Sequence, residues 1–364
     1  MVIPKINIFL SLFILLSALQ LFSGAYASDK PAGGSWSILD EKLSGKRCSA
    51  NAELLPDGNA LILGGCGIFT KENSAEIFSP EKQKITKIIN ISDTPVFAVS
   101  DCSTAHLNDG NIFLIYKVKY PDKKTKSVFE AKIFDSALYE FKDIKFSGRI
   151  NAAALSIPLD NGNILIVNSS DGADYIYDTE KQKLSRIKTG SGSYKPVNFF
   201  HKNPDGSIIF FRSNAFNKYK TYIYSGGKIE QAAENLPLGA VQLDENSYFY
   251  ADVKYDYFTG YVYNVKESKK KAVSNKIGAY ASYPAYIKLN NNNVLILGIN
   301  EKNQSKDEIK EYASYIYDRK KNMFYKISNP PVRINRHTAA VMLKDGSILF
   351  AGGNLGRRTA VYKY

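Results

Sequence analysis

The chain of 364 residues repeats one short pattern seven times: a turn dipeptide followed by two strand-like runs. The intervals between successive turns are 40 to 53 residues. Asp-Gly and Asn-Gly favour tight hairpins because Gly and Asn tolerate the positive φ that such turns require. The seven dipeptides are Asp57-Gly58, Asp109-Gly110, Asn161-Gly162, Asp205-Gly206, Glu245-Asn246, Asn292-Asn293 and Asp345-Gly346.

Each turn is followed by an apolar run, such as ALILGG or ILIVN, which indicates a strand covered on both faces. A second strand such as AEIFS or DYIYD comes next, and then a more polar one such as KLSRIKT. The unit is therefore four strands. One such sheet cannot bury its faces alone, whereas seven packed around an axis cover one another. The pattern predicts an all-β fold, a seven-bladed β-propeller. Six blades is the alternative, because the repeat near Tyr248 is the most degenerate.

The two ends of the repeat array predict how the ring closes. The last repeat stops at AVYKY (360–364), without a fourth strand, and an orphan strand, SWSILDEKL (35–43), precedes the first repeat. We expect this N-terminal strand, which carries Trp36, to complete the last blade. Residues 35–364 then form a single domain, with blades that start near residues 47, 101, 149, 195, 238, 283 and 336.

The repeats resemble those of the kelch family. The stretches RCSANAELLPDGNALILGG (47–65) and RHTAAVMLKDGSILFAGG (336–353) fit the first half of a kelch repeat, and YIYD (175–178 and 315–318) fits its third strand. The middle repeats lack the Gly-Gly pair. The resemblance implies that the first strand of each blade lies at the central channel. It also implies that the loops leading into the first strands, with those that follow the second strands, form a mouth where family members bind ligands or partners.

The first 27 residues have the character of a signal peptide. Lys5 precedes an apolar run (6–22), and Ala25-Tyr26-Ala27 has the small residues of a cleavage site. We expect cleavage after Ala27, a short linker (28–34) and export to the periplasm or the medium; the alternative is an uncleaved membrane anchor. The formal net charge is +13, and loss of residues 1–27 removes only Lys5 among charged groups, which leaves +12.

Three cysteines lie near the predicted mouth. Centring the first hairpin on Asp57-Gly58 places Cys48 almost opposite Cys66, and Cys102 opens the first strand of the next blade. An exported protein meets oxidising conditions, so we expect a disulfide, either Cys48–Cys66 or Cys48–Cys102. Buried thiols are the alternative.

Basic and aromatic side chains also gather at the predicted mouth. Arginines that converge there would hold a carboxylate or a phosphate through paired hydrogen bonds. The alternative is that the arginines join blades through bonds to backbone carbonyls or acids. The candidate ligand-binding residues are Arg47, Arg149, Lys195, Tyr283, Arg336 and His337.

The sequence gives little support to catalysis. Only three histidines are present, and His106 and His201 lie toward the other end of their strands from His337, so we expect no metal site and no cofactor. The leading hypothesis is an exported, monomeric module that binds a protein or an anionic glycan; nucleic acid is not an expected partner. The alternative is a sugar-converting enzyme, such as a sialic acid mutarotase, with Asp101 and His337 as proton-transfer candidates. The densest basic run, KESKKKAVSNK (266–276), is interpreted as a solvated strand edge.

Overall fold

The structure is a computed structural model, and it describes most of the chain from Gly33 onward. The described ranges are 33–47, 50–65, 73–91, 98–119, 128–145, 155–167, 173–187, 195–213, 219–232, 240–254, 257–264, 266–267, 269–278, 284–302, 309–331, 334, 337–353 and 356–364. In these ranges no helix is long and apolar enough to cross a membrane.

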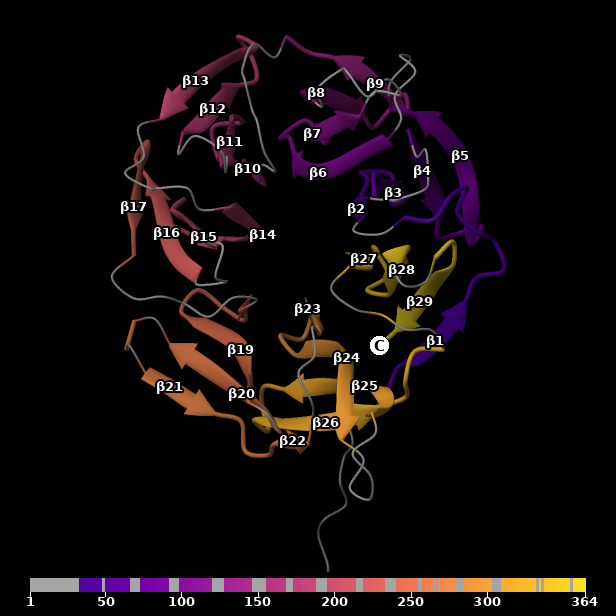
Figure 1. Cartoon of the computed structure of the whole chain (residues 1–364), viewed down its shortest axis with the longest axis vertical. Coiled ribbons are helices and arrows are strands. Elements are labelled where there is room, and N and C mark those ends of the chain that lie inside the picture. The colour runs from indigo at the N-terminus through magenta and orange to yellow at the C-terminus, as the bar shows by residue number, and fades with distance from the viewer. Residues whose placement is uncertain are drawn as a thin grey trace, which may run out of the picture. The chain divides into compact units, whose positions relative to one another are not determined.

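Residues Gly34–Tyr364 form one compact unit of seven antiparallel sheets arranged as a ring (Figure 1). This confirms the predicted seven-bladed β-propeller. Blades are numbered along the chain. The strands of blades 1 to 3 are β2 (Asn51–Leu54), β3 (Ala60–Leu63), β4 (Ser74–Ser79) and β5 (Lys84–Asn90); β6 (Ala98–His106), β7 (Ile112–Lys119), β8 (Val128–Asp135) and β9 (Glu140–Asp143); β10 (Leu155–Pro158), β11 (Ile164–Val167), β12 (Asp174–Asp178) and β13 (Lys183–Ile187).

Blade 5 carries an additional short strand, β22, which pairs with β20. The strands of blades 4 to 6 are β14 (Lys195–Lys202), β15 (Ile208–Ser213), β16 (Tyr219–Ser225) and β17 (Lys228–Gln231); β18 (Val241–Gln242), β19 (Ser247–Lys254), β20 (Tyr257–Asn264), β21 (Lys269–Ala272) and β22 (Ile277–Gly278); β23 (Ala285–Lys288), β24 (Val294–Lys302), β25 (Ile309–Asp318) and β26 (Met323–Ile327).

Blade 7 is built from both ends of the described part of the chain. It contains β27 (Ala339–Met342), β28 (Ile348–Ala351) and β29 (Thr359–Lys363), and β1 (Ser35–Ile38) adds its outermost strand. Trp36 lies opposite Tyr362, and its ring packs on that of Tyr362 at 4.7 Å and on that of Phe350 at 5.4 Å between centroids. The predicted closure by the N-terminal strand is confirmed.

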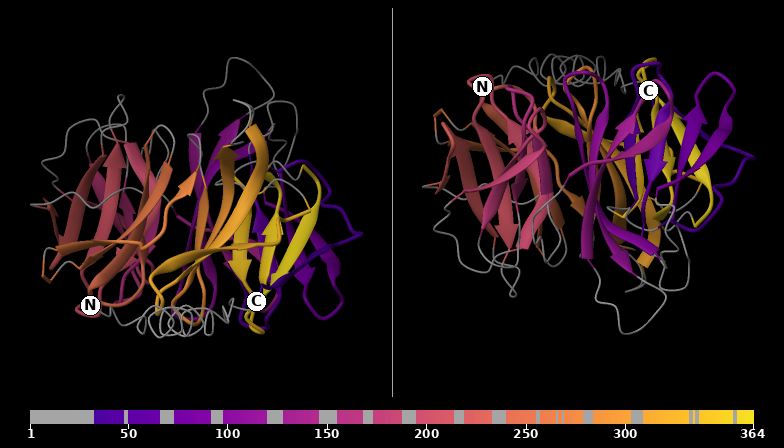
Figure 2. Two further views of the ribbon diagram at one scale, coloured as in Figure 1. Left: turned by 90° about the horizontal axis from the view of Figure 1, so that it is seen from below. Right: turned by 90° about the horizontal axis from the view of Figure 1, so that it is seen from above.

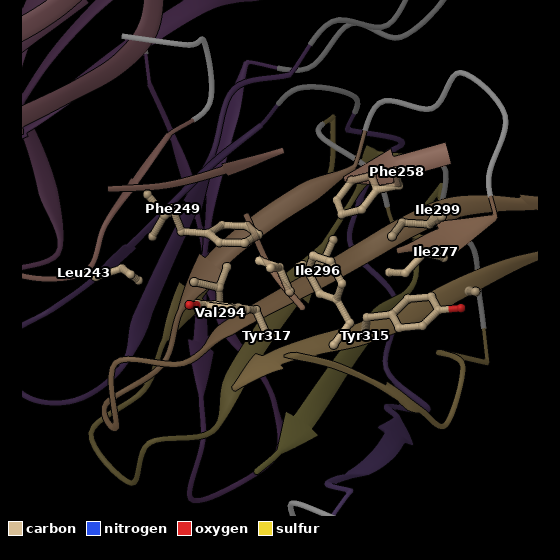
Figure 3. Close-up of a cluster of buried hydrophobic side chains, with 13 residues drawn as sticks. Leu243, Phe249, Phe258, Ile277, Val294, Ile296, Ile299, Tyr315 and Tyr317 are labelled. Atoms are coloured by element: carbon tan, nitrogen blue, oxygen red, sulfur yellow. The ribbon is translucent and has the colours of Figure 1, made fainter. Parts of the chain in front are cut away.

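The apolar runs are buried because each blade is covered by a neighbour on both faces. In β24, Val294 and Ile296 pack toward blade 5 in a cluster with Phe249 and Phe258 (Figure 3). The intervening Leu295 and Leu297 belong to a second cluster shared with blade 7. Alternation along one strand thus supplies side chains to two separate interfaces, which explains why the whole run is apolar.

The strands run between two rims of the ring (Figure 2). One rim carries the tight turns between first and second strands; we call it the turn rim. The turns of successive blades touch there: a Cβ added to Gly110 would lie 2.8 Å from Pro56, and one added to Gly206 would lie 2.9 Å from Asp160. The opposite rim carries the segments that enter the first strands, such as 44–47 and 337–338. We call it the mouth rim.

Candidate functional site

The predicted mouth residues are only partly within the described ranges. Arg149, Tyr283 and Arg336 lie outside them, as do Cys48 and Cys66. Lys195 is the first residue of β14, opposite Ser213. His337 is exposed and precedes β27 by two residues. The ligand-binding role of these residues remains a prediction.

Arg47 lies in the interior, and its guanidinium is fully enclosed by the protein. Nε donates to Glu76 Oε1 at 2.8 Å, and Nη1 donates to the carbonyl oxygens of Gly64 and Ser74, each at 2.9 Å. Nη2 donates to Ser74 Oγ at 2.8 Å. These contacts match the structural alternative, in which an arginine at a blade start bonds to protein oxygens.

Glu76, in β4, connects this arginine to the closure of the ring. Its carboxylate also accepts from the backbone N–H and from the hydroxyl of Ser44, both at 3.0 Å. Ser44 belongs to the segment that leads from β1 of blade 7 into blade 1. Arg47 lies on the same segment, and its carbonyl accepts from the backbone N–H of Gly353 in blade 7. The buried pair therefore holds the chain at the point where the last blade meets the first.

Several exposed cations lie on the mouth rim around that point. Arg357 Nε donates to the Leu43 carbonyl at 2.7 Å, and the Leu43 N–H donates back to the Arg357 carbonyl at 2.8 Å. Gly353 lies against the backbone of His337 and Thr338. A Cβ added to Gly353 would lie 2.8 Å from the His337 carbonyl oxygen. Three chain segments that are distant in sequence are thereby brought together. Their exposed basic and imidazole side chains are Lys46, His337, Arg357 and Arg358, and the exposed acids nearby in sequence are Asp40 and Glu41.

A second buried arginine was not identified from the sequence. Arg212 of β15 makes an ion pair with Asp174 of β12, and both side chains are fully buried. Because β12 belongs to blade 3 and β15 to blade 4, the pair joins two blades. The guanidinium also lies over the rings of Phe210 and Tyr222, at 5.5 and 5.1 Å from their centroids. The sequence signal for this pair was the acidic residue at the start of the third strand, Asp174 in ADYIYD.

The inner strands of blades 1 and 2 present a polar cluster that sequence reasoning also missed. Glu53 of β2 accepts from the hydroxyl of Thr104 and lies 2.9 Å from His106 Nε2, both on β6. The hydrogen bond to Glu53 raises the pKa of His106, against the opposite effect of partial burial. The His106 side chain is 46% exposed, so the imidazole remains accessible. The signal in the sequence was the pair of polar positions in NAELL and STAHL, each just before a turn.

The other histidines are placed differently. His201 is buried beside Tyr248, its Nε2 lies 3.0 Å from the Ala240 carbonyl, and burial lowers its pKa to about 4. His337 lies on the mouth rim, whereas His106 and His201 lie in strands that end at the turn rim. Within the described ranges, no three His, Cys, Asp or Glu side chains are grouped so that they could bind a metal ion.

Cys102 is buried in β6, and its side chain lies over Gly64, where an added Cβ would be 3.2 Å from Cys102 Cβ. The disulfide itself stays a prediction, since Cys48 and Cys66 lie outside the described residues.

Comparison with known proteins supports the fold and leaves the function open. No protein-family model and no curated protein sequence matches the chain. Among solved structures, a fungal alcohol oxidase of the AA5 family in complex with copper aligns at a TM-score of 0.61 with 14% identity, over 91% of this chain and 76% of that one. Virginiamycin B lyase from Staphylococcus aureus aligns at 0.59 with 10% identity, over 91% and 99% of the two chains. A streptogramin B lyase aligns at 0.56 with 10% identity, over 92% and 99%. At these identities the likeness shows a shared β-propeller fold, a scaffold on which both binding proteins and enzymes are built.

Proposed function

We propose that the chain is an exported, kelch-type propeller that binds an anionic ligand, on a protein or a glycan, at the mouth rim. The observation that carries the proposal is the meeting of three segments at the ring closure. It gathers Lys46, His337, Arg357 and Arg358 on an exposed part of this rim.

The chemistry of these side chains suits a carboxylate, sulfate or phosphate. Arginine presents a planar fork of donors that matches two anionic oxygens, and a lysine beside it adds a mobile point charge. The scaffold beneath them is rigid because the buried Arg47–Glu76 pair and the Gly353 contact fix the backbone. A preorganised site of this kind loses less conformational entropy when a ligand binds.

A glycan array at low and at moderate salt tests the proposal, with the double variant Lys46→Ser/Arg358→Ser as the site variant. Arg357 is left intact because its bonds to Leu43 support the closure. The matched control is Lys82→Ser/Lys84→Ser, two exposed lysines on blade 1. We expect acidic mono- and disaccharides on the array to bind in a salt-sensitive manner and the site variant alone to lose them. Equal binding by all three proteins would refute the mouth rim as the site.

The sugar-converting enzyme remains a second candidate, favoured by the Glu53–His106 pair. Mutarotation removes a proton from the anomeric hydroxyl and delivers one to the ring oxygen as the bond between the anomeric carbon and the ring oxygen breaks. The open carbonyl form rotates about the bond between the anomeric carbon and the next chain carbon, and the reverse transfers re-form the ring. A histidine held by a carboxylate can perform such transfers. The test is exchange NMR of the two anomers of an acidic sugar, with wild type and His106→Gln. Without acceleration by the wild type, this candidate is abandoned for that sugar.

Export is the remaining part of the proposal. The test is mass spectrometry of the protein recovered from the periplasm or the medium. The measured mass should match a chain that begins at Ser28. A chain that keeps residues 1–27 and sediments with membranes would favour the anchor instead.

A further inference from the structure

Two short segments of blades 5 and 6 are strongly basic. Residues 265–278 contain five lysines and one glutamate, and residues 319–330 contain three lysines, one arginine and no acid. Each segment has a net charge of +4, so 26 residues account for +8 of the chain's +13.

The structure joins these two segments into one surface. The first includes β21 of blade 5 and the second includes β26 of blade 6, and both strands lie on the outside of the ring (Figure 1). The Ser274 N–H donates to the Asn322 carbonyl at 2.8 Å. The side chain of Asn275 donates to the Phe324 carbonyl at 3.0 Å and accepts from the Phe324 N–H at 2.7 Å. The segment that follows β21 is thus hydrogen-bonded to the start of β26.

This surface has a rigid support. Phe324 inserts between the two blades, with ring centroids 6.1 Å from Phe249 and 5.6 Å from Phe258. It belongs to the buried cluster in Figure 3, and it fills the space above Gly260, where a Cβ would clash with its ring. The backbone that carries the lysines therefore has a fixed geometry.

The lysines themselves face solvent. Lys269 is 79% exposed, and the carboxylate of Glu267, 59% exposed, lies 3.9 Å away, which is a weak contact. Arg319 is engaged by Asp244 of blade 5. We call the exposed lysines of the two segments the lysine wall: Lys266, Lys269, Lys270, Lys271, Lys276, Lys320, Lys321 and Lys326.

The outer strand of blade 2 provides a contrast within the same molecule. Lys142 of β9 lies 2.6 Å from Asp135, and Lys132 of the adjoining β8 lies 2.6 Å from Asp143 of β9. An outer strand of this fold can therefore be protected from pairing with another chain by balanced charges. The two joined segments carry a net charge of +8, and the repulsion within such a surface is relieved when a polyanion supplies counter-charges.

We propose that the lysine wall binds a linear acidic polysaccharide. Lysine ammonium groups are point charges with little demand on the geometry of the anion, so a chain with regularly repeated carboxylates can contact several of them at once. A bilayer is less suited to the surface. Among the described residues of these two blades, Tyr257 is the exposed large apolar side chain. It lies at the opposite end of β20 from Lys269, because Tyr257 pairs with Gly278 and Lys269 pairs with Asn264.

The experiment measures the affinity of the full exported chain for polygalacturonate, with neutral dextran as the uncharged reference. The wall variant is Lys269→Ser/Lys271→Ser/Lys320→Ser. The control is Lys82→Ser/Lys84→Ser/Lys228→Ser, which removes the same charge from exposed positions on blades 1 and 4. We expect at least a tenfold loss of affinity and a shallower salt dependence for the wall variant, and a change of less than about twofold for the control.

Other outcomes overturn the proposal. Equal losses in both variants would show attraction by net charge alone. Tighter binding to phosphatidylglycerol vesicles or to polyphosphate than to polygalacturonate would assign the wall to a membrane or to a phosphate polymer. No binding at all would leave it as a solvated edge. The mouth variant Lys46→Ser/Arg358→Ser should bind polygalacturonate at the wall like wild type, so failure of the mouth proposal is distinguishable from failure of this one.

Discussion

The Nε atom of Arg47 lies 2.8 Å from Oε1 of Glu76, and neither side chain is exposed to solvent. The same carboxylate accepts two hydrogen bonds from Ser44, so it connects the segment that closes the ring with the third strand of blade 1. Removal of one partner would leave a buried charge without compensation. Such a loss is among the most costly single changes in a folded protein.

We expect Glu76→Ala to lower the free energy of unfolding by about 3–5 kcal/mol, the usual cost of leaving one member of a buried ion pair. Urea unfolding monitored by circular dichroism gives this value. Lys181→Ala, which removes an exposed partner of Asp178, is the control and should be neutral. A loss for Glu76→Ala no larger than that of the control would show that the buried pair does not stabilise the closure.

Two adjacent glycines test the seam between β1 and β29. A Cβ added to Gly34 would lie 2.6 Å from the ring of Tyr362 and would clash with the Lys363 carbonyl, whereas one added to Gly33 would meet nothing within 4 Å. Gly34→Ala should therefore displace β1 and cost about 1–3 kcal/mol, and Gly33→Ala should be silent. Trp36 is the only tryptophan, so its fluorescence reports the seam directly. Identical emission spectra and stabilities for the two variants would contradict the register of β1.

His201 makes stability depend on pH. Its folded-state pKa of about 4 lies below the ordinary value of 6.5, because burial disfavours the charged imidazole. The unfolded chain therefore binds the proton first as pH falls. The stabilisation is complete above pH 6.5 and is lost progressively toward pH 4, up to roughly 3 kcal/mol. His201→Gln, which can still donate to the Ala240 carbonyl, should flatten that part of the curve of unfolding free energy against pH. An unchanged slope in the variant would exclude His201 as the cause.

Much of the architecture could be predicted from the sequence because it follows from periodicity. The ring, its seven blades and the borrowed strand β1 depend on apolar runs and turn dipeptides, which act locally. The centre of a hairpin was predicted less well. The first turn is centred on Asp57 and not between Asp57 and Gly58, since β2 and β3 pair Leu54 with Ala60. The reason is that Gly58 N–H donates to the Leu55 carbonyl while the Asp57 carboxylate accepts from the Asn59 N–H.

The roles of individual polar side chains were harder to predict. Arg47 was a candidate ligand residue, yet its environment depends on Glu76, which is 29 residues away, in β4, whereas Arg47 precedes β2. The Glu53–His106 and Asp174–Arg212 pairs join different blades. Contacts of this kind are set by the stagger between neighbouring sheets, and the spacing of residues within one repeat does not encode that stagger.

The Glu53–His106 contact predicts a titration opposite in sign to that of His201. Because the hydrogen bond to Glu53 raises the pKa of His106, the contact stabilises the fold below pH 6.5, and this contribution is lost as pH rises through the folded-state pKa. An NMR titration of the imidazole protons should give a midpoint above 6.5 for His106, and Glu53→Gln should lower it. His201, in blade 4, serves as the internal reference, and its midpoint should be the same in both proteins. If the His106 midpoint does not move in Glu53→Gln, the carboxylate does not hold the proton on the imidazole, and the pair loses its standing as a proton-transfer site.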